Sequence, residues 1–359
     1  MNTHKSGTVL RCLLTLAMLV PLSMSGQTKG PGEEVATSGF VDFYFSRNFA
    51  RPTSHSNKYR NFDVAENQFA LSLAEISFQK AGAPIGFRID ADFGSTNDLV
   101  QGSAQSTLNN LQQAYISVVA PVGSGLTIEA GKFVTHMGLE VIESKDNWNY
   151  SRSFLFAWAI PYFHVGLRAT YPLLENLSVS GYLYNGWNNI VDNNDAKTFG
   201  ATLNFIPVDG VSVIVNWIGG SEQPDSLAAG KRNVVDIILA LQIDERLSIA
   251  ANADYGSEFL PAGFVSWKGV ALYGRLKIDD RSGLAVRAEV FSDPDGYETG
   301  IAHDLREITV TYEYRLVSNL LLRGEYRHDW STAASFDERT GINVLTHQNT
   351  FALGSVISF

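Results

Sequence analysis

Cysteine is almost absent from this chain, with the single Cys12 in 359 residues, which excludes a small secreted domain held together by disulfides. The 11 prolines and 31 glycines show no Gly-X-Y repeat, which excludes a collagen-like chain. The chain is 45% hydrophobic and only 18% charged, so it is not intrinsically disordered and has enough apolar residues for one large folded domain.

Basic residues are outnumbered. The 27 Lys and Arg residues face 37 Asp and Glu residues, a net charge of -10, and such a chain repels phosphate backbones; no nucleic-acid partner is expected. The sequence has no HExxH motif, no phosphate-binding loop and no Cys/His cluster. We therefore expect neither a metal nor any other cofactor.

Long apolar runs are confined to the N-terminus. Lys5 and Arg11 precede an apolar run over 12–22, and the small residues Ser23 and Ser25 follow, which predicts a secretory signal peptide over 1–25. The alternative, a retained membrane anchor, is disfavoured by Pro21 and by the short run. Beyond residue 25 no run is long enough for a spanning helix, which leaves a soluble all-β protein or an outer-membrane barrel.

Apolar and polar residues alternate in segments of roughly 10 residues along the rest of the chain. In one segment Leu322 and Tyr326 alternate with Arg323, Glu325 and Arg327. The pattern predicts sixteen strands, at 38–46, 67–79, 84–93, 110–119, 125–134, 162–171, 176–186, 196–206, 210–219, 230–243, 246–256, 264–279, 282–293, 303–315, 318–330 and 346–359. A change of phase between Leu73 and Ile76 predicts a β-bulge in the second strand.

The connections between these strands alternate in length. Long connections rich in Asn, Asp, Gly and Ser are expected at 47–66, 94–109, 135–161, 187–195, 220–229, 257–263, 294–302 and 331–345. The turns between them have two to five residues, as at Asp244–Glu245. This sorting indicates a transmembrane antiparallel up-and-down β-barrel over 38–359, with short periplasmic turns, long extracellular loops and a periplasmic segment at 26–37.

Aromatic residues gather at the expected strand ends, as interfacial Trp and Tyr do in membrane proteins. Trp187, Trp217, Tyr255 and Trp330 fall at outer ends, and Tyr171, Phe205, Tyr314 and Phe359 at inner ends. The alternating strand that finishes at Phe359 resembles the terminal strand that the barrel-assembly machinery recognises. Outer-membrane lipid is thus the expected surrounding, and a closed barrel of sixteen strands is expected to leave an aqueous channel.

Charged residues on the polar face of the strands are expected to line this channel, because lipid-facing Arg or Lys would each cost roughly 2–4 kcal/mol. An alternative interpretation is that Arg and Glu on neighbouring strands pair and only brace the wall. The predicted lumen wall comprises Arg88, Asp90, Asp92, Glu129, Arg168, Asp236, Asp254, Arg275, Lys277, Arg287, Glu289, Glu307, Glu313, Arg315, Arg323, Glu325, Arg327 and Asp329.

The longest connection, 135–161, is a candidate constriction loop, because loops of this length in a compact domain are usually functional. It carries Glu140, Glu143, Lys145, Asp146 and Arg152, followed by an apolar half. We expect it to dip into the lumen so that its acids face the bases of the twelfth to fifteenth strands across a constriction. A loop that covers the outer rim or makes a subunit contact is the alternative.

The sequence around this loop resembles a known family. Gly131, Lys132, Phe133, Thr135, Gly138 and Glu140, then Asn147, Asn149, Tyr150, Ser151, Arg152 and Ser153, and later Gly166 and Arg168, are similar to the putative β-barrel porin-2 (OmpL-like) family. The resemblance extends from about residue 36 to Phe359 and implies an outer-membrane diffusion pore.

The prediction is therefore a porin that passes small hydrophilic solutes and ions, with trimerisation expected by analogy with 16-stranded porins. A substrate-specific channel, for example for sugars stacked along Tyr182, Tyr184, Tyr273 and Trp267, is one alternative, and a plugged barrel with an adhesin or structural role is another. Catalysis is not expected. His303 with Asp304 and His328 with Asp329 could in principle activate water, but neighbours in a strand point to opposite faces.

Overall fold

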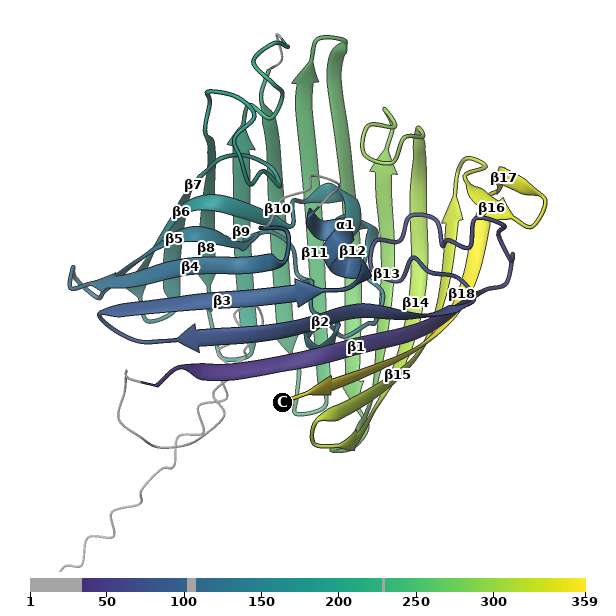
Figure 1. Ribbon diagram of the computed structural model, residues 1–359, viewed down its shortest axis with the longest axis horizontal. Coiled ribbons are helices and arrows are strands. Elements are labelled where there is room, and N and C mark those ends of the chain that lie inside the picture. The colour runs from purple at the N-terminus through teal and green to yellow at the C-terminus, as the bar shows by residue number, and fades with distance from the viewer. Residues whose placement is uncertain (1–33, 102–107, 228–229) are drawn as a thin grey trace, which may run out of the picture.

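Sixteen antiparallel strands close into one barrel in the computed structural model, which describes residues 34–101, 108–227 and 230–359 (Figure 1). Among these residues, no helix has the length and apolar character needed to cross a membrane. The strands are β1 Ala36–Asn48, β2 Gln68–Lys80, β3 Ile85–Phe93, β4 Leu111–Ala120, β5 Leu126–Val134, β6 Phe163–Leu174, β7 Leu177–Tyr184, β8 Thr198–Phe205, β9 Val211–Gly220, β10 Arg232–Gln242, β11 Leu247–Leu260, β12 Gly263–Lys277, β13 Ser282–Asp293, β14 His303–Val317, β15 Leu320–Ser331 and β18 His347–Ser358.

The predicted strand number, order and class are confirmed, with ends that differ by a few residues. The predicted signal peptide at 1–25 lies outside the described residues, and β1 already begins inside the segment expected to precede the barrel. The barrel closes where β1 pairs with β18, and backbone hydrogen bonds join Gly39 and Phe359 in both directions, at 3.2 and 3.0 Å. Phe359 is thus the last residue of the seam.

One long connection is shorter than predicted. The strands β11 and β12 continue to Leu260 and from Gly263, so only residues 261–262 join them, where a connection over 257–263 was expected. The alternating pattern continues through this stretch, and the glycines and polar residues that suggested a loop lie within paired strands. The other long connections are gathered at one end of the barrel and the short turns at the other (Figure 1).

Two long connections contain structure that the pattern did not reveal. The short helix α1 Ser95–Gln101 lies in the second, and the hairpin of β16 Phe336–Glu338 with β17 Gly341–Leu345 lies in the last. The predicted bulge of β2 is present but lies just upstream, because β1 residues Asp42 and Phe43 pair with Leu73 and Leu71 and leave Ser72 unpaired.

The strands have one exposed apolar face and one buried polar face. In β15, Arg323, Glu325 and Arg327 are all less than 5% exposed, whereas Tyr326 is 43% exposed. The outward face matches a lipid surrounding, and the inward face is buried because loops fill part of the barrel. Of the predicted aromatic positions, Trp217 and Tyr255 lie exposed near the long-loop ends, but Trp187 instead packs on the guanidinium of Arg232.

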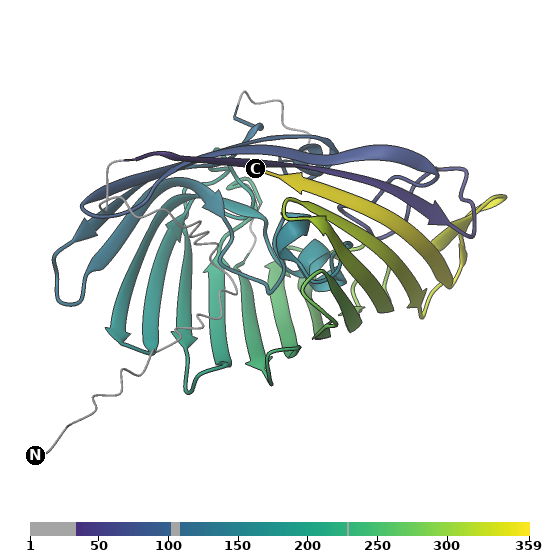
Figure 2. The same ribbon diagram turned by 90° about the horizontal axis from the view of Figure 1, so that it is seen from below.

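The hydrophobic core of the molecule lies inside the barrel. It combines residues from the inner faces of many strands with residues from the connection 135–162, such as Phe154, Leu155 and Phe156, and with Phe62 from the first long connection. Figure 2, viewed from below, shows a helical segment of the chain within the ring of strands. The interior is therefore divided between packed loops and open space.

Candidate functional site

The constriction loop, here residues 135–162, folds into the barrel and contains two short helical turns, Ser144–Asp146 and Leu155–Ala159. Its backbone is fixed by carboxylates of the wall. Glu289 of β13 accepts hydrogen bonds from the N–H groups of Phe154 and Leu155, both at 2.7 Å. Glu325 of β15 accepts those of Tyr150 at 2.6 Å and Ser151 at 3.0 Å. These two carboxylates hold the second half of the loop against the wall.

Arginines of the same wall hold the loop carbonyl groups. Arg287, whose side chain is 0% exposed, donates to Ser151 O at 2.6 Å and forms ion pairs with Glu140 at 2.7 Å and Glu307 at 2.6 Å. Arg323 donates to the carbonyls of Ser144 and Asn147. Arg327 donates to Arg152 O at 2.6 Å and pairs with Asp329 at 2.6 Å. Charges on β13 and β15 therefore bind the loop itself.

Only part of the predicted acid-to-base arrangement is present. Glu140 pairs with Arg287 and also accepts from Ser153 N at 2.7 Å. Glu143 instead accepts from Gln112 of β4, on a different part of the wall. Lys145 pairs with its neighbour Asp146. The expectation that the loop acids as a group face the bases of β12–β15 is wrong, because only Glu140 pairs with one of these bases and three of them bind loop carbonyl groups instead.

Arg152 forms its hydrogen bonds within the loop itself. Its guanidinium donates to the carbonyls of Val141, Ile142 and Tyr150, and it lies over the Phe62 ring at 4.5 Å. The side chain is 4% exposed. It therefore ties the two halves of the loop together and lies away from the open part of the barrel.

Tyr150 lies behind the closing seam of the barrel. Its hydroxyl donates to Asp42 of β1 at 3.0 Å, and its ring packs against Gly354 of β18, where a Cβ atom would come within 2.7 Å of the ring. Burial beside Asp42 raises the pKa of Tyr150 well above its usual value. The first and last strands thus both contact one loop side chain.

The beginning of the loop lies on the opposite wall. Gly138 N donates to Asp236 of β10 at 3.0 Å, and the His136 ring stacks on Tyr182 of β7 with ring centres 4.2 Å apart. His136 also contacts the Tyr184 hydroxyl at 3.1 Å and the Trp217 carbonyl at 3.2 Å. Burial lowers the pKa of the His136 imidazole to about 4, so the ring is neutral at pH 7.

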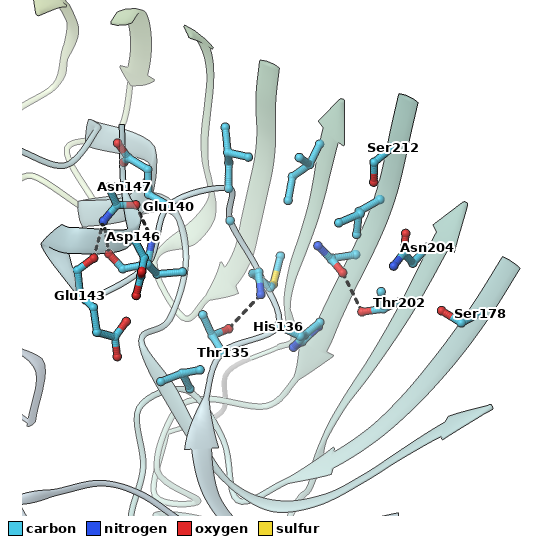
Figure 3. A pocket seen from close by; sticks show the side chains of 18 of the residues that line it. Thr135, His136, Glu140, Glu143, Asp146, Asn147, Ser178, Thr202, Asn204 and Ser212 are labelled. Carbon is cyan, nitrogen blue, oxygen red and sulfur yellow. Dashed lines mark hydrogen bonds between the residues drawn. The ribbon is translucent and has the colours of Figure 1, made fainter. Parts of the chain in front are cut away.

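A cavity of about 2270 Å³ lies between the loop and the short-turn end. The residues 134–148 of the loop cover it, and the inner faces of β4–β9 form much of its wall (Figure 3). That wall is neutral and polar on β7–β9, where Ser178, Thr202, Asn204 and Ser212 face the loop. The cavity is therefore a water-accessible vestibule that is covered by a folded loop.

The predicted wall residues divide into two groups at this cavity. Seven line it, namely Arg88, Glu129, Arg168, Arg275, Glu313, Arg315 and Arg323, together with the loop residues Glu140, Glu143, Lys145 and Asp146. Asp90, Arg287, Glu289, Glu325, Arg327 and Asp329 are at most 3% exposed, behind the loops. Lys277 lies at the rim, where it pairs with Asp280 at 2.7 Å and is 53% exposed.

Neighbouring charges of the lining group are paired. Arg88 pairs with Asp90 at 2.7 Å, and Arg168 forms two hydrogen bonds with Glu129 on the adjacent strand. Arg275 pairs with Glu313 two strands away. The Arg168–Glu129 pair is of the wall-bracing kind that the sequence also allowed, between neighbouring strands.

The sequence did not identify Arg60 of the first long connection as part of this assembly. Its guanidinium is buried and pairs with Asp63 at 2.5 Å and with Asp329 of β15 at 2.8 Å. Long-range contacts of this kind leave no periodic signal. The only available hint is that Asp329 lies on a wall position that requires a compensating charge.

Two further groups of residues singled out in the sequence have the following surroundings. The stacking track is not formed, because Tyr184, Tyr273 and Trp267 are at most 4% exposed and Trp267 donates to Ala159 O of the loop at 3.1 Å. His303 and His328 bond to Ser331 and Asn349, respectively, and not to the neighbouring aspartates. Within the described residues no group of His, Cys, Asp and Glu side chains is arranged to hold a metal ion.

A closed sixteen-stranded barrel with an apolar exterior, a loop folded into its interior and a water-accessible vestibule defines the class of outer-membrane β-barrel channels. Residues 34–359 match the family model described as Putative beta-barrel porin-2, OmpL-like, and the chain belongs to this family. It is therefore a porin of the outer membrane, and the family resemblance in the sequence is confirmed.

Solved structures agree in fold at low sequence identity. The anion-selective porin from Comamonas acidovorans is similar with a TM-score of 0.65 and 11% identity, over 91% of this chain and 99% of that one. OmpT of Vibrio cholerae in its trimer form gives 0.63 and 10%, over 92% and 100%. The outer membrane channel DcaP of Acinetobacter baumannii gives 0.62 and 13%, over 93% and 99%. No curated protein matches the sequence.

Proposed function

We propose that this porin allows passive diffusion of small hydrophilic solutes and ions, through a channel whose narrowest level is set by the constriction loop. The observation that carries the proposal is the anchored loop above the 2270 Å³ cavity. A loop whose backbone is bound by five charged side chains of β13 and β15 keeps a fixed position, which is what a size-selecting constriction requires. Transport of this kind needs no covalent chemistry and no cofactor.

Single-channel conductance of the refolded mature protein in a planar bilayer tests this proposal. We expect discrete ohmic steps, and larger steps after deletion of residues 140–153. Deletion of residues 339–342, at the tip of the β16–β17 hairpin, is the matched control and should leave the step size unchanged. A folded, heat-modifiable barrel that gives no steps would favour the plugged, structural role, and an unchanged step size after the first deletion would refute the role of the loop.

A sugar-specific channel is the second candidate. The neutral wall of β7–β9 favours it, since Tyr182 and the hydroxyl and amide groups of Ser178, Thr202 and Asn204 line the cavity. Such groups bind uncharged polar solutes through hydrogen bonds and ring stacking. Liposome uptake of a neutral sugar that saturates with concentration would support this candidate, whereas uptake that stays proportional to concentration would support general diffusion.

Export, assembly and oligomeric state complete the proposal. Residues 1–25 act as a signal peptide, and the residues between it and β1 precede the barrel in the periplasm. The barrel-assembly machinery recognises the strand that ends at Phe359, and the porin forms a homotrimer. Support comes from the sequence pattern, from the place of Phe359 at the seam and from the trimer form of the similar OmpT. N-terminal sequencing of the mature chain, assembly of a Phe359-deletion variant and the mass of the detergent complex test the respective parts.

A further inference from the structure

Three arginines surround a single carboxylate at the short-turn end of the cavity. Arg275 of β12, Arg315 of β14 and Arg323 of β15 all line it, together with Glu313 of β14. We propose that Arg275 and Arg315 form a binding site for small oxyanions, carboxylates or phosphates, at this mouth. The inference deepens the diffusion function and rests on it, because it names the class of solute that the vestibule concentrates.

The local charge is not balanced. The Glu313 carboxylate bonds Arg275 and lies 3.4 Å from the Arg323 guanidinium, so one acid serves two bases. The Arg323 guanidinium also donates hydrogen bonds to the loop carbonyls of Ser144 and Asn147. The Arg315 guanidinium has no salt bridge among the described residues and donates only to Ser318 O, at 3.2 Å. Arg315 therefore keeps an unpaired positive charge, and Arg275 shares its one carboxylate with Arg323.

Strand register explains the imbalance. Glu313 of β14 stands opposite Arg323 of β15, but Arg315 stands opposite Leu321, which offers no acceptor. Residues two apart on one strand face the same side about 7 Å apart, so Arg315 lies just below Glu313 on the same wall. Gly283 of β13 stands opposite Glu313, and a Cβ atom there would approach Glu313 Oε1 to 3.1 Å. The missing side chain lets the Arg275–Glu313 pair cross β13.

The two guanidinium groups are accessible to a solute. The Arg275 side chain is 41% exposed and Arg315 is exposed, whereas Glu313 is 13% exposed and lies behind the bases. The nearby Lys145–Asp146 pair of the loop, which shares a small cavity with Arg315, is neutral as a unit. An entering oxyanion thus meets planar donors that match its geometry, and guanidinium groups bind carboxylate and phosphate through two parallel hydrogen bonds.

Inorganic phosphate is the probe for this site. In bilayers at 0.1 M KCl, where screening is moderate, added phosphate should reduce the KCl conductance of the wild-type channel and the effect should saturate. Arg315→Gln should raise the half-blocking concentration by about three-fold or more, and Arg315→Glu should abolish the block. Arg315→Lys should weaken the block less than Arg315→Gln does, because it keeps the charge and loses only the paired hydrogen bonds of the guanidinium.

Lys277→Gln is the matched control, since Lys277 ends the same strand as Arg275 but pairs with Asp280 outside the cavity lining. A wild-type half-blocking concentration in Arg315→Gln, or an equal change in Lys277→Gln, would overturn the site. Calorimetric titration of phosphate into the detergent-folded barrel gives a readout without conduction, and the Arg275→Gln/Arg315→Gln double variant should lose the saturable heat. A silent channel that still binds phosphate would refute diffusion but not the site.

Discussion

The walls on the two sides of the barrel differ in what they contact. The inner faces of β13 and β15 carry charged residues that are nearly all buried, since Arg287, Glu289, Glu325 and Arg327 bind loop backbone. The inner faces of β7–β9 carry Ser, Thr and Asn side chains that face the open cavity. The charges of β13 and β15 are thus mostly structural, and the cavity is lined instead by the neutral wall and by a few charges near the short turns, such as Arg275 and Arg315. A count of lumenal charges therefore does not describe the surface of the pore.

Replacing Arg287 in the buried wall should cause the largest loss of stability. Arg287→Ala leaves the buried carboxylates of Glu140 and Glu307 without their base, and breaking a buried pair in this way costs about 3–5 kcal/mol. Urea-induced unfolding in lipid vesicles measures the loss. Lys277→Ala, an exposed pair at the rim, serves as control and should change stability by less than about 1 kcal/mol. Equal losses in both variants would contradict the structural role of the buried wall.

A smaller loss is expected from Glu325→Gln. The amide keeps one acceptor for the N–H groups of Tyr150 and Ser151, where the carboxylate supplies two charged ones, so about 1–3 kcal/mol of loop anchoring is lost. Hydrogen exchange should become faster at residues 150 and 151, and conductance noise should increase. Glu129 forms its hydrogen bonds with Arg168 and not with the loop, so Glu129→Gln should leave exchange at these two amides unchanged.

Acidification should weaken the other attachment of the loop. The pKa of His136 is lowered to about 4 in the folded protein, whereas an ordinary histidine has a pKa near 6.5. As pH falls, the unfolded chain therefore protonates His136 before the folded protein does. The contribution to stability is therefore complete above about pH 6.5 and is lost as pH falls toward 4, by about 1–2 kcal/mol. Unfolding midpoints measured from pH 7 to pH 4 should fall less steeply in His136→Gln than in the wild type. Parallel pH profiles would exclude His136 as the titrating group.

Ser178→Asp should cause the smallest change in stability. It also tests directly which wall of the barrel the solutes contact. The new carboxylate lies in the cavity lining, so stability should change by no more than about 0.5 kcal/mol while the reversal potential in a KCl gradient shifts toward cations. The buried Thr309 of β14 provides the contrasting position. Thr309→Asp should destabilise the barrel and leave the selectivity of the remaining folded channels unchanged.

Much of the fold follows from local pattern. Sixteen strands, their order and their two faces are predictable because alternation and turn residues repeat in every hairpin. The two-residue connection at 261–262 was missed because glycines and polar residues also occur in strands that extend beyond the apolar band. The interior contacts were less predictable. Glu289 and Arg287 could be assigned to the lumen by phase, but their bonds to Phe154 and Ser151 join residues more than 130 positions apart.

Tyr150 joins the constriction loop to the two strands that close the barrel. Its ring lies against the bare backbone of Gly354 on the last strand, its hydroxyl bonds the first strand, and its N–H group bonds β15. A single loop side chain therefore braces the seam between β1 and β18 from inside, so that the loop helps to keep the barrel closed as well as to fill it.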